Sequence, residues 1–209
     1  MMKITIIDYG MGNLKSVKKA FDALALETEI TSDPEVILKA EKIVLPGVGA
    51  FRDAITTLQQ TGMSEAIKEV VKKGNPFLGI CLGMQLIFEK SYEYGEYEGL
   101  GLLPGEIVHF KPSDMRLQDG TSLKVPHMGW NTLEIVKREP LFEGLKQQDF
   151  VYFVHSYYLE TQADVVSCYT QYGKRIAVAA QKDNVFATQF HPEKSGQVGL
   201  QILKNFGGL

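Results

Sequence analysis

Apolar residues in the first half of the chain alternate between short continuous runs and a spacing of three or four residues. The β-rich run 3–8, the run 42–45 and the apolar run 77–80 predict strands, and 29–31 predicts a short strand. The helical spacing predicts helices from Leu14 onward, from Pro34 after a cap at Ser32 or Asp33, and over 51–60, 64–73 and 82–90. This alternation indicates a parallel sheet covered by helices.

The second half is richer in strands. Alternating and β-branched runs predict strands over 106–110, 133–137, 149–160, 164–172, 176–181 and 185–190, with glycines and Asp183-Asn184 between them. A helix is predicted only at the end, over 195–206, and the Gly- and Glu-rich stretch 92–105 predicts a loop. We therefore expect an α/β fold with an open, mixed, mainly parallel central sheet flanked by helices.

Size and composition exclude several classes of protein. The 209 residues suit one domain, 1–209, and 44% hydrophobic with 22% charged residues is ordinary for a globular chain. A net charge of −3 without a long basic run argues against nucleic acid as a partner. No apolar run approaches the roughly 20 residues that cross a bilayer. Two cysteines form no disulfide framework, so we expect a cytoplasmic protein.

One of those cysteines lies between two glycines at the end of a predicted strand. Gly79-Ile80-Cys81-Leu82-Gly83 has the frame of a tight strand-to-helix turn that exposes a nucleophile, in which the N–H of Leu82 would face a developing oxyanion. The alternative is a small buried thiol, since free cysteine is often buried.

A second glycine-rich segment, 46–49, follows another predicted strand. Ligands gather at the carboxyl ends of strands in open α/β sheets, and glycines let backbone N–H groups approach a ligand closely. Val48 and Gly49 are therefore candidates for a second oxyanion donor. An ordinary turn is the alternative.

A thiolate nucleophile needs a proton carrier that a third group orients. His191 follows a predicted strand, and Pro192 favours an extended conformation there, so that Glu193 can face the same side as His191. The other three histidines are predicted to be structural (His109), exposed (His127) and buried in an apolar strand (His155).

These motifs resemble those of the class I (triad) glutamine amidotransferases, which implies a flavodoxin-like fold of that family. Five stretches are similar to the branch that forms the glutaminase subunits of imidazole glycerol phosphate synthases in histidine biosynthesis. They are IDYGMGN at 7–13, PGVGAF at 46–51, PHMGWN at 126–131, FVHSYY at 153–158 and HPEKS at 191–195.

The resemblance implies that the enzyme hydrolyses the side-chain amide of glutamine. Cys81 would attack the carboxamide, and His191, held by Glu193, would protonate the departing ammonia. The glutamine would be held by Gln85, Ser156 and Tyr157. No metal and no organic cofactor is implied.

The resemblance also implies a protein partner. Ammonia would pass to a cyclase subunit with a (β/α)8-barrel fold, which forms a heterodimer with this chain and makes imidazole glycerol phosphate and an aminoimidazole carboxamide ribotide. The residues implied at that interface are Asn13, Met128, Trp130, Asn131 and Lys194. A lone tryptophan is more often a core residue, but tryptophan is also enriched at interface hot spots.

Three alternatives stay open. A glutaminase of the same class could serve nucleotide, folate, tryptophan or pyridoxal phosphate synthesis, although the bare PGVGAF form resembles the histidine branch. A cysteine hydrolase or peptidase on a similar sheet would cleave peptides or esters instead of glutamine. A binding module that only keeps the fold would not react with a glutamine-analogue electrophile at Cys81.

Overall fold

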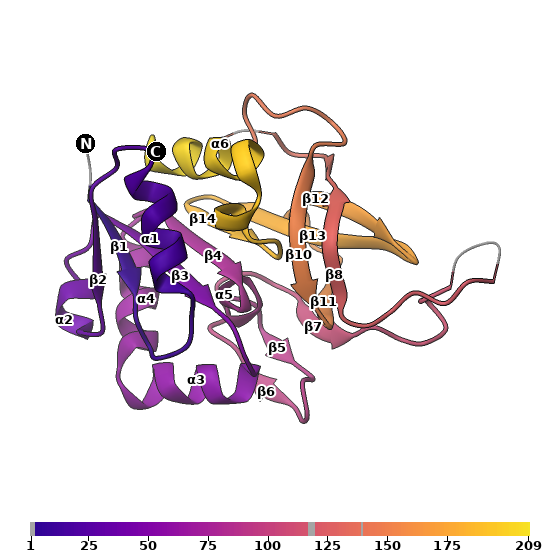
Figure 1. The fold of residues 1–209 in the computed structure, drawn as a ribbon. Helices are drawn as coiled ribbons and strands as arrows, with labels where there is room; N and C mark the ends of the chain where they lie inside the picture. Colours follow the sequence, from indigo (N-terminus) through magenta and orange to yellow (C-terminus); the bar gives the residue numbers. More distant parts are fainter. Residues whose placement is uncertain (1–2, 117–119, 139) are drawn as a thin grey trace.

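A five-stranded parallel core forms one half of the central sheet (Figure 1). The computed structural model describes residues 3–116, 120–138 and 140–209. The parallel strands follow the order β2 (Thr28–Thr31), β1 (Ile4–Ile7), β3 (Lys42–Gly47), β4 (Phe77–Cys81) and β14 (Val185–Thr188). All of these strands except β2 are fully buried.

The sheet continues with mostly antiparallel strands from the second half of the chain. The neighbours after β14 are β13 (Lys174–Lys182), β11 (Tyr157–Glu160), β7 (Glu106–His109), β5 (Lys90–Ser91) and β6 (Tyr97–Glu98). β12 (Val166–Tyr172) pairs with β13 and with β9 (Glu134–Ile135). The mixed, mainly parallel α/β sheet expected from the sequence is therefore confirmed.

Helices cover both faces of the parallel strands and create two hydrophobic cores. One core lies under α2 (Pro34–Ile37), α3 (Phe51–Gln60), α4 (Met63–Lys72) and α5 (Leu82–Leu86), and the other under α1 (Leu14–Asp22) and α6 (Gly196–Gly207). Alternate strand residues enter opposite cores: Ile43 and Leu45 of β3 enter the first core and Val44 the second. Asp33 caps α2 with Pro34 as its first residue, as predicted.

The predicted strand over 149–160 is wrong in one respect, because it is two strands in different sheets. β10 (Phe150–His155) pairs with β8 (His127–Thr132) in a separate antiparallel ribbon, whereas β11 joins the central sheet. The change falls at Ser156, and Nδ1 of His155 lies 2.7 Å from the carbonyl oxygen of Tyr157 across this corner. The strand predicted over 133–137 is only the short β9.

Two further predictions about local structure are corrected. α5 ends at Leu86, not at residue 90, because the N–H groups of Leu100 and Leu102 bond to the carbonyls of Leu86 and Ile87. The stretch 92–105, predicted as a loop, contains β6, which pairs with β5. Among the described residues, no helix has the length and apolar character needed to cross a membrane.

A buried lysine joins the central sheet to the last helix. Lys42, at the start of β3, is fully buried, and its Nζ donates to the carbonyls of Phe206 (3.0 Å), Gly207 (2.7 Å) and Leu209 (3.1 Å). Burial lowers the pKa of Lys42. Because the carbonyls at a helix C-terminus lack intrahelical partners and attract positive charge, this ammonium stabilises the end of α6.

Candidate active site

Cys81 occupies the turn between β4 and α5. Its backbone has φ +56° and ψ −109°, in a region that residues other than glycine rarely adopt. The glycines beside it are required by close packing: a Cβ on Gly83 would lie 1.7 Å from the carbonyl oxygen of Leu45, and one on Gly79 would lie 2.6 Å from that of Gly83. The turn predicted from the G-x-C-x-G frame is therefore present.

His191 and Glu193 form a buried pair a few residues after the end of β14. Nδ1 of His191 lies 2.7 Å from Oε1 of Glu193, and their side chains are only 3% and 2% exposed. His191 is extended, with φ −99° and ψ +97°, before Pro192 opens a short 3-10 turn, η1 (Pro192–Lys194). The two side chains meet, as the sequence predicted, although residues 192–194 form this turn and not the extended segment on which that prediction was based.

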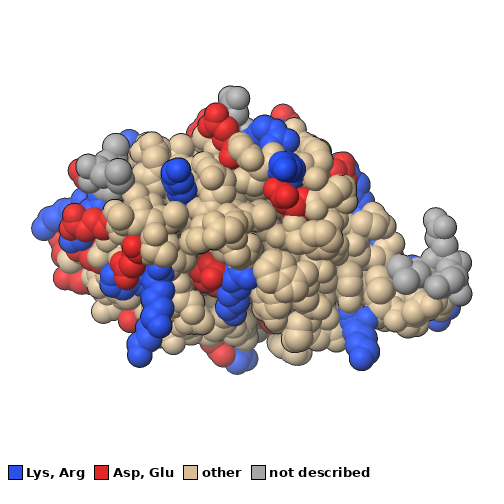
Figure 2. Space-filling model, turned by 45° about the horizontal axis from the view of Figure 1, so that its top comes forward, with Lys and Arg blue, Asp and Glu red and all other residues tan. Residues whose placement is uncertain are grey.

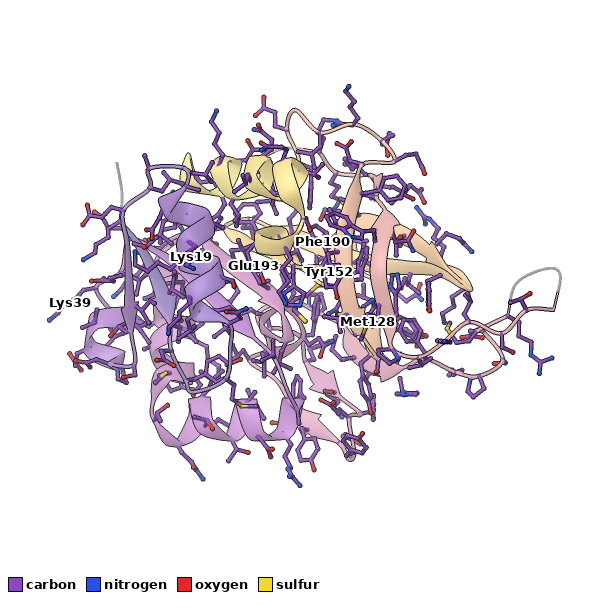
Figure 3. All side chains as sticks on the ribbon, in the orientation of Figure 1. Lys19, Lys39, Met128, Tyr152, Phe190 and Glu193 are labelled. Atoms are coloured by element: carbon purple, nitrogen blue, oxygen red, sulfur yellow. The ribbon has the colours of Figure 1, made fainter. Side chains whose placement is uncertain are left out.

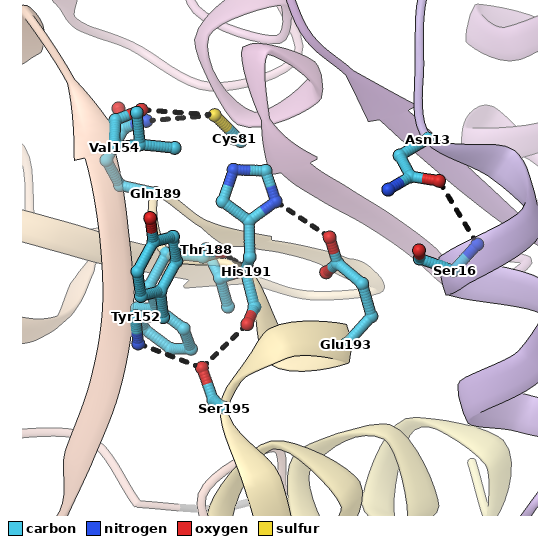
Figure 4. A network of polar contacts seen from close by, with 11 residues as sticks. Asn13, Ser16, Cys81, Tyr152, Val154, Thr188, Gln189, His191, Glu193 and Ser195 are labelled. Carbon is cyan, nitrogen blue, oxygen red and sulfur yellow. Dashed lines mark hydrogen bonds and ion pairs between the residues drawn. The ribbon is translucent and has the colours of Figure 1, made fainter. Parts of the chain in front are cut away.

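The backbone of His191 is fastened to the ribbon strand β10. Its N–H donates to the carbonyl of Tyr152 (3.0 Å), and its carbonyl accepts from Oγ of Ser195 (2.6 Å), which itself accepts from the N–H of Tyr152 (3.0 Å). These three bonds fix where the imidazole ring can reach (Figure 4).

The second ring nitrogen of His191 is turned toward Cys81 (Figure 4). Nε2 is buried, and the sulfur of Cys81 is the group toward which it is directed. Burial by itself lowers the pKa of His191, but hydrogen bonds to Cys81 and Glu193 and the negative charge of both groups raise it to about 10. The site thus favours an imidazolium beside the sulfur.

Two glutamine side chains connect the nucleophile to the corner between β10 and β11. Nε2 of Gln189 donates to Sγ of Cys81 (3.7 Å), and its Oε1 accepts from Nε2 of Gln85 (3.0 Å). Nε2 of Gln85 also approaches the carbonyl of Tyr157 at 3.4 Å. Cys81 itself lies 3.9 Å from the carbonyl of Val154.

A cavity of about 400 Å³ opens at these residues, within the range of small-molecule sites. Eight of the nine residues predicted for catalysis, the oxyanion and the substrate line it; Glu193 alone stands behind His191. Those eight are Val48, Gly49, Cys81, Leu82, Gln85, Ser156, Tyr157 and His191. Gly49 has φ +101°, which only glycine adopts without strain.

Sequence reasoning missed a carboxylate in the wall of this cavity. Glu93 lies in the stretch 92–105, where no motif was found, and its side chain lines the cavity beside the exposed Tyr94. Oε2 of Glu93 accepts from the N–H of Phe51 at 2.6 Å, and burial raises the pKa of this carboxyl. No periodic signal marks Glu93, because it belongs to an irregular segment folded over the strand ends.

The prediction that His127 is exposed is wrong. His127 is 2% exposed, and its ring stacks between Phe153 (4.6 Å between centroids) and Tyr172 (3.9 Å). The register of the ribbon places it opposite His155, which is buried as predicted, and both rings face inward. His109, predicted to be structural, lines the cavity wall with its ring edge against Tyr157.

The outer face of the ribbon carries exposed apolar side chains beside the cavity. Met128 is 61% exposed, Trp130 57% and Phe150 56%, and the rings of Trp130 and Tyr152 meet edge to face. We call these four residues the ribbon face. In Figure 3, Met128 and Tyr152 lie on the ribbon and Glu193 lies between the ribbon and α1. In Figure 2 the middle of the visible face is mostly uncharged.

The other residues implied at a partner interface differ in their surroundings. Lys194 is exposed, with Nζ 6.0 Å from the ring centre of Tyr152. Asn13 is exposed and caps α1 by accepting from the N–H of Ser16. Asn131, in contrast, is half-buried, and its amide bonds within the chain. Among the described residues, no group of three or more His, Cys, Asp or Glu could hold a metal ion.

The family profile of the class-I glutamine amidotransferases matches residues 5–207. The chain belongs to this family. Two solved structures from Thermotoga maritima are similar in fold: PurLQS (TM-score 0.72, 18% identity, 99% of this chain and 98% of that one) and a glutamine amidotransferase (TM-score 0.63, 16% identity, 97% and 81%).

Relatives with much higher sequence identity place the chain in one branch of this family. Imidazole glycerol phosphate synthase subunit HisH from Geobacter sulfurreducens is 54% identical over 208 residues, covering 99% of both chains. The subunits of the same name from Syntrophotalea carbinolica and Caldanaerobacter subterraneus are 54% and 53% identical, over 99% and 98% of this chain and 100% and 97% of theirs. Within the amidotransferase family, the chain belongs with the HisH subunits.

Proposed function

We propose that this chain hydrolyses glutamine to glutamate and ammonia through Cys81, His191 and Glu193. The observation that carries the proposal is the buried His191–Glu193 pair, which leaves Nε2 of His191 directed at a cysteine on a strained strand-to-helix turn. The thiolate is the reactive form of cysteine, and Nε2 of His191 is the group placed to exchange a proton with the sulfur.

The reaction follows from these positions. Sγ of Cys81 attacks the carboxamide carbon, and the negative charge on the oxygen is stabilised by backbone N–H groups of Leu82 and of Val48 or Gly49. The C–N bond breaks as Nε2 of His191 gives its proton to the nitrogen, which leaves as ammonia. Water then attacks the γ-glutamyl thioester and gives a proton to His191, and glutamate and the thiol are released.

Glutamine also carries an α-ammonium and an α-carboxylate. Glu93 places a carboxylate in the cavity wall, so we assign it to the α-ammonium. Gln85, Ser156 and Tyr157 bound the same cavity and would hold the remainder of the substrate, as the sequence implied. Glu93→Gln should therefore raise the KM for glutamine by roughly tenfold, the usual loss for one charge-assisted hydrogen bond.

In this proposal the ammonia is used by a second protein. The relatives' name describes a subunit of imidazole glycerol phosphate synthase. We propose that this chain forms a heterodimer with a (β/α)8-barrel cyclase that uses the ammonia, in the cytoplasm, and that the chain acts as one glutaminase domain. The ribbon face, together with Lys194, is the docking surface that we assign to the barrel, because it is apolar and adjoins the cavity.

Such a subunit should be nearly silent without its partner. If an N–H of Val48 or Gly49 points away from the cavity in the free chain, one oxyanion donor is missing, which costs on the order of 10²–10³ in rate. Docking beside this segment would turn the donor inward. A high glutaminase rate that the partner leaves unchanged contradicts this gating.

The test of the function measures the production of ammonia from glutamine separately from its use by the cyclase. In the reconstituted complex, Cys81→Ala should abolish cyclase turnover with glutamine and preserve it with added ammonium salt. Cys168→Ala is the matched control, because Cys168 is buried outside the cavity. Glutamine hydrolysis by Cys81→Ala would refute the proposal, and cleavage of peptides or esters by the wild-type chain would favour the hydrolase alternative.

A further inference from the structure

A chain of hydrogen bonds runs beneath the ribbon to the substrate-binding corner. Nδ2 of Asn131 lies 3.2 Å from Nε2 of His127, Nδ1 of His127 lies 2.9 Å from Nε2 of His155, and Nδ1 of His155 lies 2.7 Å from the carbonyl oxygen of Tyr157. Both rings are nearly inaccessible to water, at 2% and 5% exposure. The mechanism of glutamine hydrolysis uses neither ring.

The direction of every bond in this chain is determined. The carbonyl of Tyr157 can only accept, so Nδ1 of His155 must carry a hydrogen, and its Nε2 must then accept from Nδ1 of a neutral His127. Nε2 of His127 in turn accepts from Nδ2 of Asn131.

The orientation of the Asn131 amide is fixed independently. Its Oδ1 accepts from the N–H of Thr132 (2.8 Å), and its Nδ2 donates its other hydrogen to the carbonyl of Gln171 (3.0 Å). Only one arrangement therefore satisfies all of the groups, with both imidazoles neutral and protonated at Nδ1. Burial lowers the pKa of His127 to about 3 and that of His155 to about 4, which keeps both rings neutral at pH 7.

The chain of bonds ends where the substrate is expected to bind. The carbonyl of Tyr157 also accepts a hydrogen bond from Nε2 of Gln85. Gln85 is linked by hydrogen bonds through Gln189 to the sulfur of Cys81. The bond from His155 closes the corner at which the chain leaves the ribbon and enters the central sheet, and this corner brings Ser156 into the cavity.

We propose that His155, with its tautomer fixed by His127, is a positioning residue that holds the glutamine-binding corner 156–157 in register with the ribbon face. The proposal rests on the proposed function. It assigns to the buried pair a role in binding glutamine, distinct from the chemistry at Cys81: the neutral pair gives the corner one defined geometry, and a shift of the ribbon moves the corner with it.

Two substitutions of His155 separate its two bonds. His155→Gln places an acceptor near the position of Nε2 but loses the donor to Tyr157, whereas His155→Asn keeps a donor near the position of Nδ1 and loses the acceptor. We expect His155→Gln to raise the KM for glutamine by about tenfold or more, with kcat changed less than about threefold, and His155→Asn to raise it far less. Turnover with ammonium salt in the complex should not change.

Tyr172→Phe is the matched control. It keeps the ring that stacks on His127 and removes only a hydroxyl bonded to the carbonyl of Lys124, so its KM should equal that of the wild type. Equal increases in KM for His155→Gln and His155→Asn, or a KM for His155→Gln within about twofold of the wild type, would overturn the proposal.

A second measurement uses the wild-type chain, so it does not depend on whether a variant folds. Nitrogen-15 NMR of the histidine rings in the full-length wild-type chain at pH 7 should show His127 and His155 neutral and protonated at Nδ1. A hydrogen on Nε2 of either ring overturns the proposal. This result does not depend on glutaminase activity, so failure of the positioning role and failure of the proposed function can be told apart.

Discussion

Replacing Trp130 by alanine should weaken binding of the partner subunit with little effect on the chain alone. A tryptophan has up to about 250 Å² of surface, so its 57% exposure leaves roughly 140 Å² for a partner to cover. At about 25 cal/mol per Å² this area corresponds to roughly 3.5 kcal/mol, of which the alanine would retain a small part. We therefore expect a loss of about 2–3 kcal/mol, which raises the Kd by roughly 30- to 150-fold.

Isothermal titration of the barrel subunit into this chain measures the effect directly. Ile30→Ala is the matched control, because Ile30 is also exposed but lies on β2, at the opposite edge of the sheet from the cavity. The melting temperature of Trp130→Ala should stay close to that of the wild type, since the side chain is largely exposed and meets the ring of Tyr152 edge to face. A Kd within about threefold of the wild type would show that the ribbon face is not the docking surface.

Three further changes test the site and the fold. His191→Ala should reduce glutamine hydrolysis to background while Glu193→Gln keeps partial activity, because the proton carrier matters more than the group that orients it; wild-type kinetics for Glu193→Gln would move the third role to another carboxylate. Lys42→Met should lower the unfolding free energy by about 3 kcal/mol in urea titrations, since the carbonyls of Phe206, Gly207 and Leu209 lose the ammonium donor and, among the described residues, only that of Phe206 keeps another, the N–H of Leu209; an unchanged midpoint contradicts this. Below pH 6.5 the unfolded chain binds protons that buried His127 and His155 do not, so the unfolding free energy should fall toward pH 4 by about 1.4 kcal/mol per pH unit for each histidine. His127→Gln should reduce that slope, and an equal slope in both proteins would refute the assignment.

The parts of the fold that the sequence predicts well are those with local signals. Buried parallel strands such as β3 and β4 appear as continuous apolar runs, and Pro34 and Asp33 mark the start of α2. The turn at Cys81 is predictable because its glycines are required by close backbone packing within the same segment and against its neighbour β3.

The errors concern residues whose surroundings are set by distant segments. The run 149–160 has one uninterrupted strand pattern, and nothing within it shows that the strand changes sheets at Ser156. His127 has polar and loop-like neighbours in the sequence, and only pairing with β10 buries it. Glu93 enters the cavity from an irregular segment, so its position depends on how the β5–β6 hairpin folds over α3.

Mass spectrometry after reaction with a glutamine-analogue electrophile tests the central claim most directly. The reagent carries the α-ammonium and α-carboxylate of glutamine, so it should be directed to the cavity, and Cys168 provides an internal control in the same digest. In the complex, we predict one adduct per chain, on Cys81, whose formation is slowed by glutamine and by His191→Ala. Absence of an adduct on Cys81, or labelling of Cys81 that glutamine does not slow, would contradict the account.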